Sequence, residues 1–210
     1  MHPIFAQGDM ILFQGDSITD SDRNRFDPDD MGRGFAAMAA AFFCAQYPEL
    51  GIKFINRGMG GDRSCDMRLR WEKDCIDLQP DWVSILIGIN DTWRFFDSGL
   101  ETSPLEFEEN CRAMLEDVRM HTKAGLILCE PFLLPYPEDR GLWREDLDPK
   151  IHILRALARE FGAIYVPFDG LFAKASTRQE LTYWLKDGVH PTPAGAALMA
   201  QAWLDAVMVP

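Results

Sequence analysis

The sequence has few of the residues that bind metals or build disulfide frameworks. Only 4 histidines occur in 210 residues, and they do not cluster at metal-ligand spacing. The 5 cysteines are an odd number without a Cys-x-x-Cys pair, so we interpret them as reduced thiols. We therefore expect neither a metal site nor a cofactor.

Basic residues and long apolar runs are also scarce. The chain has 21 basic against 33 acidic residues, a formal net charge of −12, which disfavours binding to nucleic acid or to anionic membranes. No apolar stretch approaches the roughly 20 residues that a membrane span needs, and no basic segment precedes a long apolar run at the N-terminus. We expect a cytoplasmic protein, unless a signal peptide has been removed, with no nucleic-acid or membrane partner.

Five short apolar runs, each bounded by turn residues, predict the strands of a sheet. Helical patterns separate these runs, and crossovers of that length are what parallel pairing requires. With 47% hydrophobic residues, the chain can build one core. We predict a single domain over residues 1–210, with a three-layer α/β/α fold and a flavodoxin-like parallel sheet of order 2-1-3-4-5. The predicted strands are Met10–Phe13, Lys53–Asn56, Trp82–Ile87, Leu126–Cys129 and Ile164–Val166.

Turn-forming residues and prolines mark the expected boundaries in the rest of the chain. Residues 88–91 are predicted to form the turn that closes the central strand. The segment from Glu130 to Leu147 is predicted as a long loop because it holds several prolines and aromatics, and loops of this length are often functional. Asp148-Pro149 then marks the start of the next helix.

Four polar clusters follow predicted strands or precede the last helix. The strand order places the ends that carry Ser17 and Asn90 side by side. Each cluster alone has a structural interpretation, because Asp16 or Ser17 can cap a helix and Asn90 can stabilise a turn. The combination is far more specific than any single cluster. The clusters are Gly15-Asp16-Ser17, Gly60-Gly61-Asp62, Gly88-Ile89-Asn90-Asp91 and Asp187-Gly188-Val189-His190.

At these four clusters the chain resembles the SGNH hydrolases, also called GDSL-type esterases. The matching segments are GDSIT at 15–19, NRGMGGD at 56–62, GIND at 88–91 and DGVHP at 187–191, so the resemblance spans nearly the whole chain. It implies that Ser17 is the catalytic nucleophile, His190 the general base and Asp187 the residue that orients the base. It also implies the SGNH hydrolase fold.

The same resemblance implies an oxyanion hole with three donors. These are the backbone N–H groups of Ser17 and Gly61 and the side-chain amide of Asn90, with Gly60 left open as the alternative to Gly61. A donor aimed at the developing negative charge is typically worth about 3 to 4 kcal/mol in rate. The Asn90 amide can supply such a donor at the crevice between the first and third strands.

The chemistry of serine supports the same three residues independently. A serine hydroxyl is a weak nucleophile at neutral pH, so a histidine must accept its proton and a carboxylate must hold the correct tautomer. The short spacing between Asp187 and His190 lets one tight loop carry both groups. The remaining histidines, His2, His121 and His152, have no such motif beside them.

Two further stretches resemble the acetylxylan esterases of the SGNH type. They are Trp71-Glu72-Lys73-Asp74 and the run from Pro80 through Arg94. The resemblance implies a serine esterase that acts on short-chain, acetyl esters through an acyl-enzyme intermediate. The expected partner is a small acylated sugar, such as an acetylated xylo-oligosaccharide, or another short-chain ester, with a homo-oligomer as a possible assembly.

The candidate substrate-binding residues are Asp16, Trp93, Tyr136 and Trp184. Aromatic rings can offer flat faces to a sugar, although they pack in cores just as often. Two other functions stay open. The same triad would serve a lysophospholipase or thioesterase, and a non-catalytic flavodoxin-like module would cradle a phosphate at residues 15–19. That module would leave Asp187 and His190 without a role.

Overall fold

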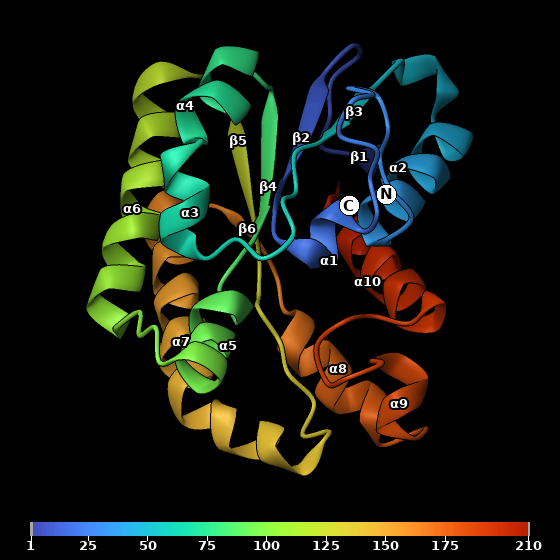
Figure 1. Cartoon of the computed structure of the whole chain (residues 1–210). Helices are drawn as coiled ribbons and strands as arrows, with labels where there is room; N and C mark the ends of the chain where they lie inside the picture. Colours follow the sequence, from blue (N-terminus) through green and yellow to red (C-terminus); the bar gives the residue numbers. More distant parts are fainter. Residues whose placement is uncertain (1, 210) are drawn as a thin grey trace.

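The computed structural model describes residues 2–209 and contains the predicted parallel sheet (Figure 1). Its order is β3-β2-β4-β5-β6 with every neighbouring pair parallel, which is the predicted order 2-1-3-4-5 and confirms the predicted fold class. The strands are β2 (Met10–Gly15), β3 (Lys53–Asn56), β4 (Trp82–Leu86), β5 (Gly125–Cys129) and β6 (Ile164–Val166).

Helices cover both faces of this sheet, because alternate residues of each buried strand contribute to two separate cores. Ile11 and Phe13 of β2 face one core, and Leu12 faces the other. The first core lies under α2 (Phe35–Gln46) and α10 (Pro193–Ala206). The second lies under α3 (Ser64–Leu69), α4 (Trp71–Asp74), α6 (Pro104–His121) and α7 (Arg144–Phe161), on the opposite side of the sheet in Figure 1.

Shorter elements connect these strands and helices and pair the two ends of the described chain. The two terminal strands pair antiparallel as a separate two-stranded sheet, which the sequence pattern did not predict. No helix within residues 2–209 has both the length and the apolar content needed to cross a membrane. These elements are β1 (His2–Pro3), α1 (Ser17–Asp20), η1 (Pro48–Leu50), η2 (Ile76–Leu78), α5 (Ile89–Ser98), η3 (Glu138–Trp143), α8 (Phe168–Ser176), α9 (Leu181–Trp184) and β7 (Met208–Val209).

Two predicted boundaries differ from the structure. The helix expected to start at Asp148-Pro149 begins at Arg144, with Pro149 inside it. Proline removes one N–H donor near the start of a helix, while Arg144 forms ion pairs with Asp148 at 2.6 Å and with Asp169 at 2.6 Å that hold the first turns. The expected turn after β4 is instead the first turn of α5.

Trp203 joins α10 to the centre of the sheet. Its side chain is fully buried, its Nε1 donates to the Ser84 hydroxyl at 3.0 Å, and its ring lies 5.0 Å from the Phe13 ring.

We expect Trp203→Ala to lower the free energy of unfolding by about 3 to 5 kcal/mol. The exposed Phe42 of α2 is the control, and its replacement by Ala should change stability by less than about 0.5 kcal/mol. Urea unfolding followed by circular dichroism measures the stability of both variants. Equal losses of stability in the two variants would contradict the role of Trp203 in joining α10 to the sheet.

Candidate active site

The ends of two neighbouring strands bring Ser17 and Asn90 to one edge of the sheet. β2 pairs with β4, with Gly15 opposite Leu86. Ser17 is the first residue of α1, which follows β2, and Asn90 lies in the first turn of α5, which follows β4. Carboxyl ends of adjacent parallel strands with oppositely directed connections form a crevice, and both residues stand at that crevice.

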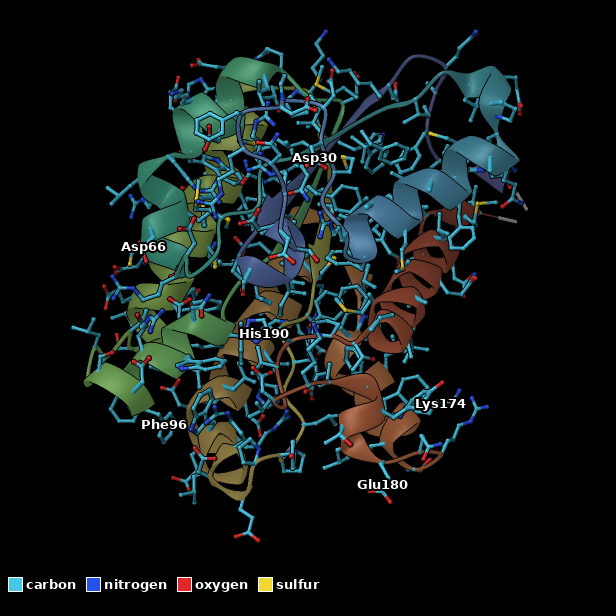
Figure 2. All side chains as sticks on the ribbon, turned by 45° about the vertical axis from the view of Figure 1, so that its right-hand side comes forward. Asp30, Asp66, Phe96, Lys174, Glu180 and His190 are labelled. Atoms are coloured by element: carbon cyan, nitrogen blue, oxygen red, sulfur yellow. The ribbon has the colours of Figure 1, made fainter. Side chains whose placement is uncertain are left out.

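His190 and Asp187 reach Ser17 from the segment between α9 and α10. The Ser17 hydroxyl lies 3.0 Å from His190 Nε2, and His190 Nδ1 lies 2.7 Å from Asp187 Oδ2. The other carboxylate oxygen of Asp187 accepts the backbone N–H groups of Val189 at 3.1 Å and His190 at 2.8 Å. Figure 2 shows His190 at the centre of the molecule, between α5 and the C-terminal segments. One carboxylate therefore orients the ring and also closes the loop that carries it.

The charges of this pair favour a base at His190. The hydrogen bond that His190 donates to Asp187 raises the pKa of His190, against the opposing effect of burial. Burial raises the pKa of Asp187, but hydrogen bonds from the His190 ring and backbone outweigh it and lower the pKa to about 2. Asp187 is therefore ionised at neutral pH, which favours the tautomer with hydrogen on Nδ1 and leaves Nε2 to accept the serine proton.

Gly188 allows this loop to pack closely. Its φ is +84°, and a Cβ atom there would lie 2.1 Å from the carbonyl oxygen of Tyr136. The Leu134 N–H donates to the Gly188 carbonyl at 2.9 Å. Only a residue without a side chain fits both the backbone conformation and this contact, so the glycine between Asp187 and His190 has a direct geometric cause.

The sequence left open whether Gly60 or Gly61 is the candidate oxyanion donor, and the hydrogen bonds of the structure distinguish the two. The Gly60 N–H donates to Asp20 Oδ2 at 3.1 Å and is not free for another acceptor. The Gly61 N–H has no hydrogen-bond partner within the described chain, and its φ is +90°. The Ser17 N–H lies at the start of α1, where it has no intrahelical acceptor. Gly61 rather than Gly60 therefore has the N–H that can bind an oxyanion.

Asn90 keeps one amide hydrogen available. Its Nδ2 donates to the carbonyl oxygen of Asp62 at 3.1 Å, and a primary amide has two N–H donors. The side chain is 6% exposed, so this bond fixes its orientation in a largely desolvated position. It also ties α5 to the segment that directly follows Gly61.

A second buried bond ties the same two segments, through residues to which the sequence analysis gave no catalytic role. The fully buried Asp91 carboxylate accepts the Ser64 N–H at 2.9 Å and the Ser64 hydroxyl at 2.6 Å. Asn110 of α6 donates to that hydroxyl at 3.3 Å. Asn90 and Asp91 thus hold residues 62 and 64, just after the predicted oxyanion donor Gly61. Serine is so common at helix starts that the sequence around Ser64 gave no sign of this contact.

The predicted substrate-binding residues occupy different environments. Asp16 is fully buried and caps α1 by accepting the Ile18 N–H at 2.9 Å, so its observed contact is structural. Trp93 lies beside the triad, with its ring 5.7 Å from that of His190. Tyr136 is exposed, and Trp184 is half-buried with its ring 4.9 Å from that of Tyr183.

Trp93 belongs to a larger aromatic cluster that the sequence did not reveal. The Trp93 ring packs edge-on against the Trp143 ring, with the ring centres 5.2 Å apart. The Phe96 ring stacks on the Trp143 ring, also with the centres 5.2 Å apart. The Arg140 guanidinium lies 3.9 Å from the Trp143 ring centre and 4.8 Å from that of Trp93. Such cation–π contacts stabilise ring positions, so Trp93 is held firmly next to His190.

A pocket of about 730 Å³ opens beside Ser17 and His190. This volume lies within the range of about 300 to 1,000 Å³ that small-molecule sites occupy. Charged and polar side chains make up much of its wall, and apolar groups come from α1, α2 and the start of α10. Its lining includes Ile18, Asp20, Arg25, Arg33, Phe35, Met38, Gly60, Lys186, Asp187, Pro191, Thr192 and Ala196.

The site links a serine, a histidine and an aspartate by hydrogen bonds at the switch point of the sheet, with free N–H donors nearby. This arrangement defines a serine ester hydrolase of SGNH type. The GDSL-like Lipase/Acylhydrolase family matches residues 13–198, and the chain belongs to this family. It is a carboxylic ester hydrolase.

Its relatives include characterised esterases. An acetylxylan esterase of Geobacillus stearothermophilus is 34% identical over 206 residues, 95% of this chain and 94% of the relative. The solved structure of a mutant of an acetyl-xylooligosaccharide esterase from Geobacillus superposes with a TM-score of 0.89 at 31% identity, covering 98% of this chain and 97% of the other. An α/β hydrolase from the metagenome of Lake Arreo, Spain, has a TM-score of 0.89 at 30% identity, with 97% and 96% covered. Structures described as catalytic mutants of the Geobacillus esterase replace a serine, an aspartate and a histidine by alanine.

The bond between Ser64 and Asp91 can be tested by removing one hydroxyl. We expect Ser64→Ala to lower kcat on an aryl acetate about tenfold with little change in KM, because the Gly61 segment loses a restraint that matters for transition-state geometry. The loss of a partner for the buried Asp91 carboxylate should also cost about 1 to 3 kcal/mol of stability.

Ser103→Ala is the matched control for that variant. Ser103 caps α6 by accepting the Glu106 N–H at 3.2 Å, and removing such a cap typically costs about 1 kcal/mol. Both variants lose stability, but only Ser64→Ala should lose kcat at a temperature well below unfolding. A kcat for Ser64→Ala equal to that of Ser103→Ala would show that Ser64 has only a structural role.

Proposed function

We propose that the protein removes acetyl groups from xylo-oligosaccharides or related acetylated sugars through an acyl-enzyme intermediate. The observation that carries this proposal is the wide pocket beside the hydrogen-bonded Ser17 and His190, whose wall carries charged side chains alongside apolar ones. The 34% identity to an acetylxylan esterase over nearly the whole chain supports the same substrate class.

The geometry supports a two-step acyl transfer. In the first step the Ser17 Oγ attacks the acetyl carbonyl carbon while His190 Nε2 takes the hydroxyl proton. The N–H groups of Ser17, Gly61 and Asn90 bind the oxygen as it becomes negatively charged. His190 then gives its proton to the sugar oxygen, which leaves as an alcohol.

The second step returns the enzyme to its starting state. Water donates a proton to His190 Nε2 as its oxygen attacks the acetyl carbonyl carbon on Ser17. The tetrahedral intermediate collapses, the bond to Ser17 Oγ breaks, and the serine takes back the proton from His190 as acetate leaves. Asp187 stays ionised throughout and stabilises the imidazolium that forms in each step.

The pocket walls favour a sugar over a fatty chain. A long acyl chain gains about 0.8 kcal/mol for each methylene buried against apolar surface. Charged side chains such as Arg33, Asp20 and Lys186 line the pocket at the triad, and burying methylenes against them gives no such gain. Sugar hydroxyls, in contrast, can bond to these groups. A lysophospholipase function therefore has less support than the deacetylation of saccharides.

A substrate panel tests this proposal. We expect acetate release from acetylated xylo-oligosaccharides, and a kcat/KM on aryl esters that falls from acetyl through butyryl to octanoyl because a longer acyl group finds no apolar channel. Ser17→Ala should lower the rate by at least about a thousandfold with an unchanged thermal transition, which controls for a contaminating esterase. A rising slope toward octanoyl, with no acetate from the saccharides, would favour the lipase or thioesterase function instead.

The pH dependence follows from the Asp187–His190 pair. Only neutral His190 can accept the serine proton, so activity falls as pH drops through its pKa, which Asp187 raises above the ordinary 6.5. The acid limb of kcat/KM should therefore have its midpoint above pH 6.5. In Asp187→Asn the midpoint should shift to lower pH, with a rate loss of about 10⁴-fold. A midpoint that stays in place in this variant would assign the limb to another group.

A further inference from the structure

The pocket beside the triad is rich in positive charge, although the chain as a whole has a net charge of −12. Four cationic side chains, Arg23, Arg25, Arg33 and Lys186, contribute to its lining. An acidic protein as a whole repels anions at a distance. At the pocket, this group of cations gives the surface the opposite sign of charge.

Two of the four cations already have a carboxylate partner. Arg25 lies 2.5 Å and Arg23 3.8 Å from the carboxylate oxygens of Asp20. Arg33 and Lys186 are exposed and form no ion pair with any carboxylate in residues 2–209. These two side chains are therefore available to a ligand that enters the pocket.

The pocket's carboxylates leave this charge incompletely balanced. Three of them contribute to the lining: Asp20 is held by its arginines, Asp187 is bound to His190, and Asp22 is exposed. Four cations against three carboxylates leave one positive charge, before any protonation of His190. A carboxylate carries one negative charge, whereas a phosphate monoester carries about 1.5 to 2 at neutral pH. The balance fits a carboxylate.

The end of α2 adds to this charge. Gly34, its N-cap, and Phe35, its first residue, both line the pocket. No side chain caps this end, and its first turn contains no acidic residue. The positive end of a helix dipole therefore faces the same space as the Arg33 side chain, and favours an anion there.

The position of the pocket indicates which part of the ester it holds. An acetyl group fills only a small part of about 730 Å³, and His190, which protonates the departing alcohol, is itself part of the wall. The alcohol portion therefore extends along the pocket. Lys186 lines the same pocket as His190, and its backbone N–H donates to the His190 carbonyl oxygen at 2.8 Å, so Lys186 stands near the departing group.

We propose that Arg33 and Lys186 bind a carboxylate on the alcohol portion of the ester, so that the preferred substrate is an acetylated saccharide that carries an acidic sugar. This inference rests on the proposed deacetylation of saccharides and narrows it to one class. The two residues set specificity, and the acyl transfer itself uses Ser17, His190 and Asp187.

The experiment compares two saccharides that differ in one charge. One is an acetylated xylo-oligosaccharide with a uronic acid branch, and the other is the same compound with that carboxyl group reduced to an alcohol. We expect kcat/KM, measured as acetate release, to be about three- to tenfold higher for the acid at low ionic strength, since exposed ion pairs contribute modestly. The ratio should approach one in about 1 M salt.

Charge-removing variants test the residues. The double variant Arg33→Gln, Lys186→Gln should bring the ratio of the two kcat/KM values close to one. Lys174→Gln is the control, because Lys174 of α8 is exposed and lies at the edge of the molecule in Figure 2, away from His190. It changes the net charge without touching the pocket and should keep the wild-type ratio.

The outcomes separate this inference from the proposed function. Acetate release from both saccharides at equal kcat/KM would overturn the carboxylate site and leave the deacetylase function standing. A wild-type preference that persists in the double variant would overturn the assignment to Arg33 and Lys186. No acetate from either saccharide, with aryl esters still cleaved, would overturn the proposed function and this inference with it.

Discussion

The parallel pairing of β2 with β4 is the constraint on which the rest of the site depends. Because Gly15 stands opposite Leu86, α1 and α5 start side by side at one edge of the sheet. The connection from β2 leads to α2 on one face, and that from β4 leads through α5 to α6 on the other. This divergence opens the crevice that the segment carrying His190 then closes. A slip of one residue in this register would turn the buried side chains of β2 to the opposite face and displace Ser17 from His190.

A partly buried arginine, Arg70, fixes the loop that the crevice needs. Arg70 donates to the carbonyl oxygens of Arg57 at 2.9 Å and Gly15 at 3.2 Å, and to the Asp62 carboxylate at 2.6 Å. It therefore links the end of β2 to both sides of the glycine loop. Together with the bonds of Asn90 and Asp91, it restrains the residues on both sides of Gly61. Preorganised donors lose nothing to reorganisation when charge develops, and this is the physical reason for so many buried polar contacts around one glycine.

The sequence predicted the sheet and the triad because both have local signals. Apolar runs give the strands, the helical crossovers between them indicate parallel pairing, and the order is that of the flavodoxin-like doubly wound sheet. Ser17, Asp187 and His190 stand in short, distinctive motifs. The contacts that hold the site have no such signal. Ser64 meets Asp91 across 27 positions, and Arg140 reaches Trp93 only after the chain folds back. The start of α7 at Arg144 was missed for the same reason, since Pro149 is a strong local signal and the bond from Arg144 to Asp169 is a distant one.

Two carboxyl groups near the nucleophile respond to pH in opposite ways. Asp187 has a folded pKa of about 2, below its ordinary 3.8, so it contributes stability above pH 3.8 that is lost as pH falls through 2. Asp16 is fully buried with an unpartnered Oδ2, and burial raises its pKa to about 7. The folded state keeps this proton up to that pH while the unfolded chain releases it near 3.8, so stability declines as pH rises between the two values. Above pH 7 an ionised Asp16 would place a second negative charge near His190, whose pKa it raises. Burying Asp16 therefore keeps this carboxyl group largely neutral below that pH, which leaves Asp187 as the principal anion that tunes the base.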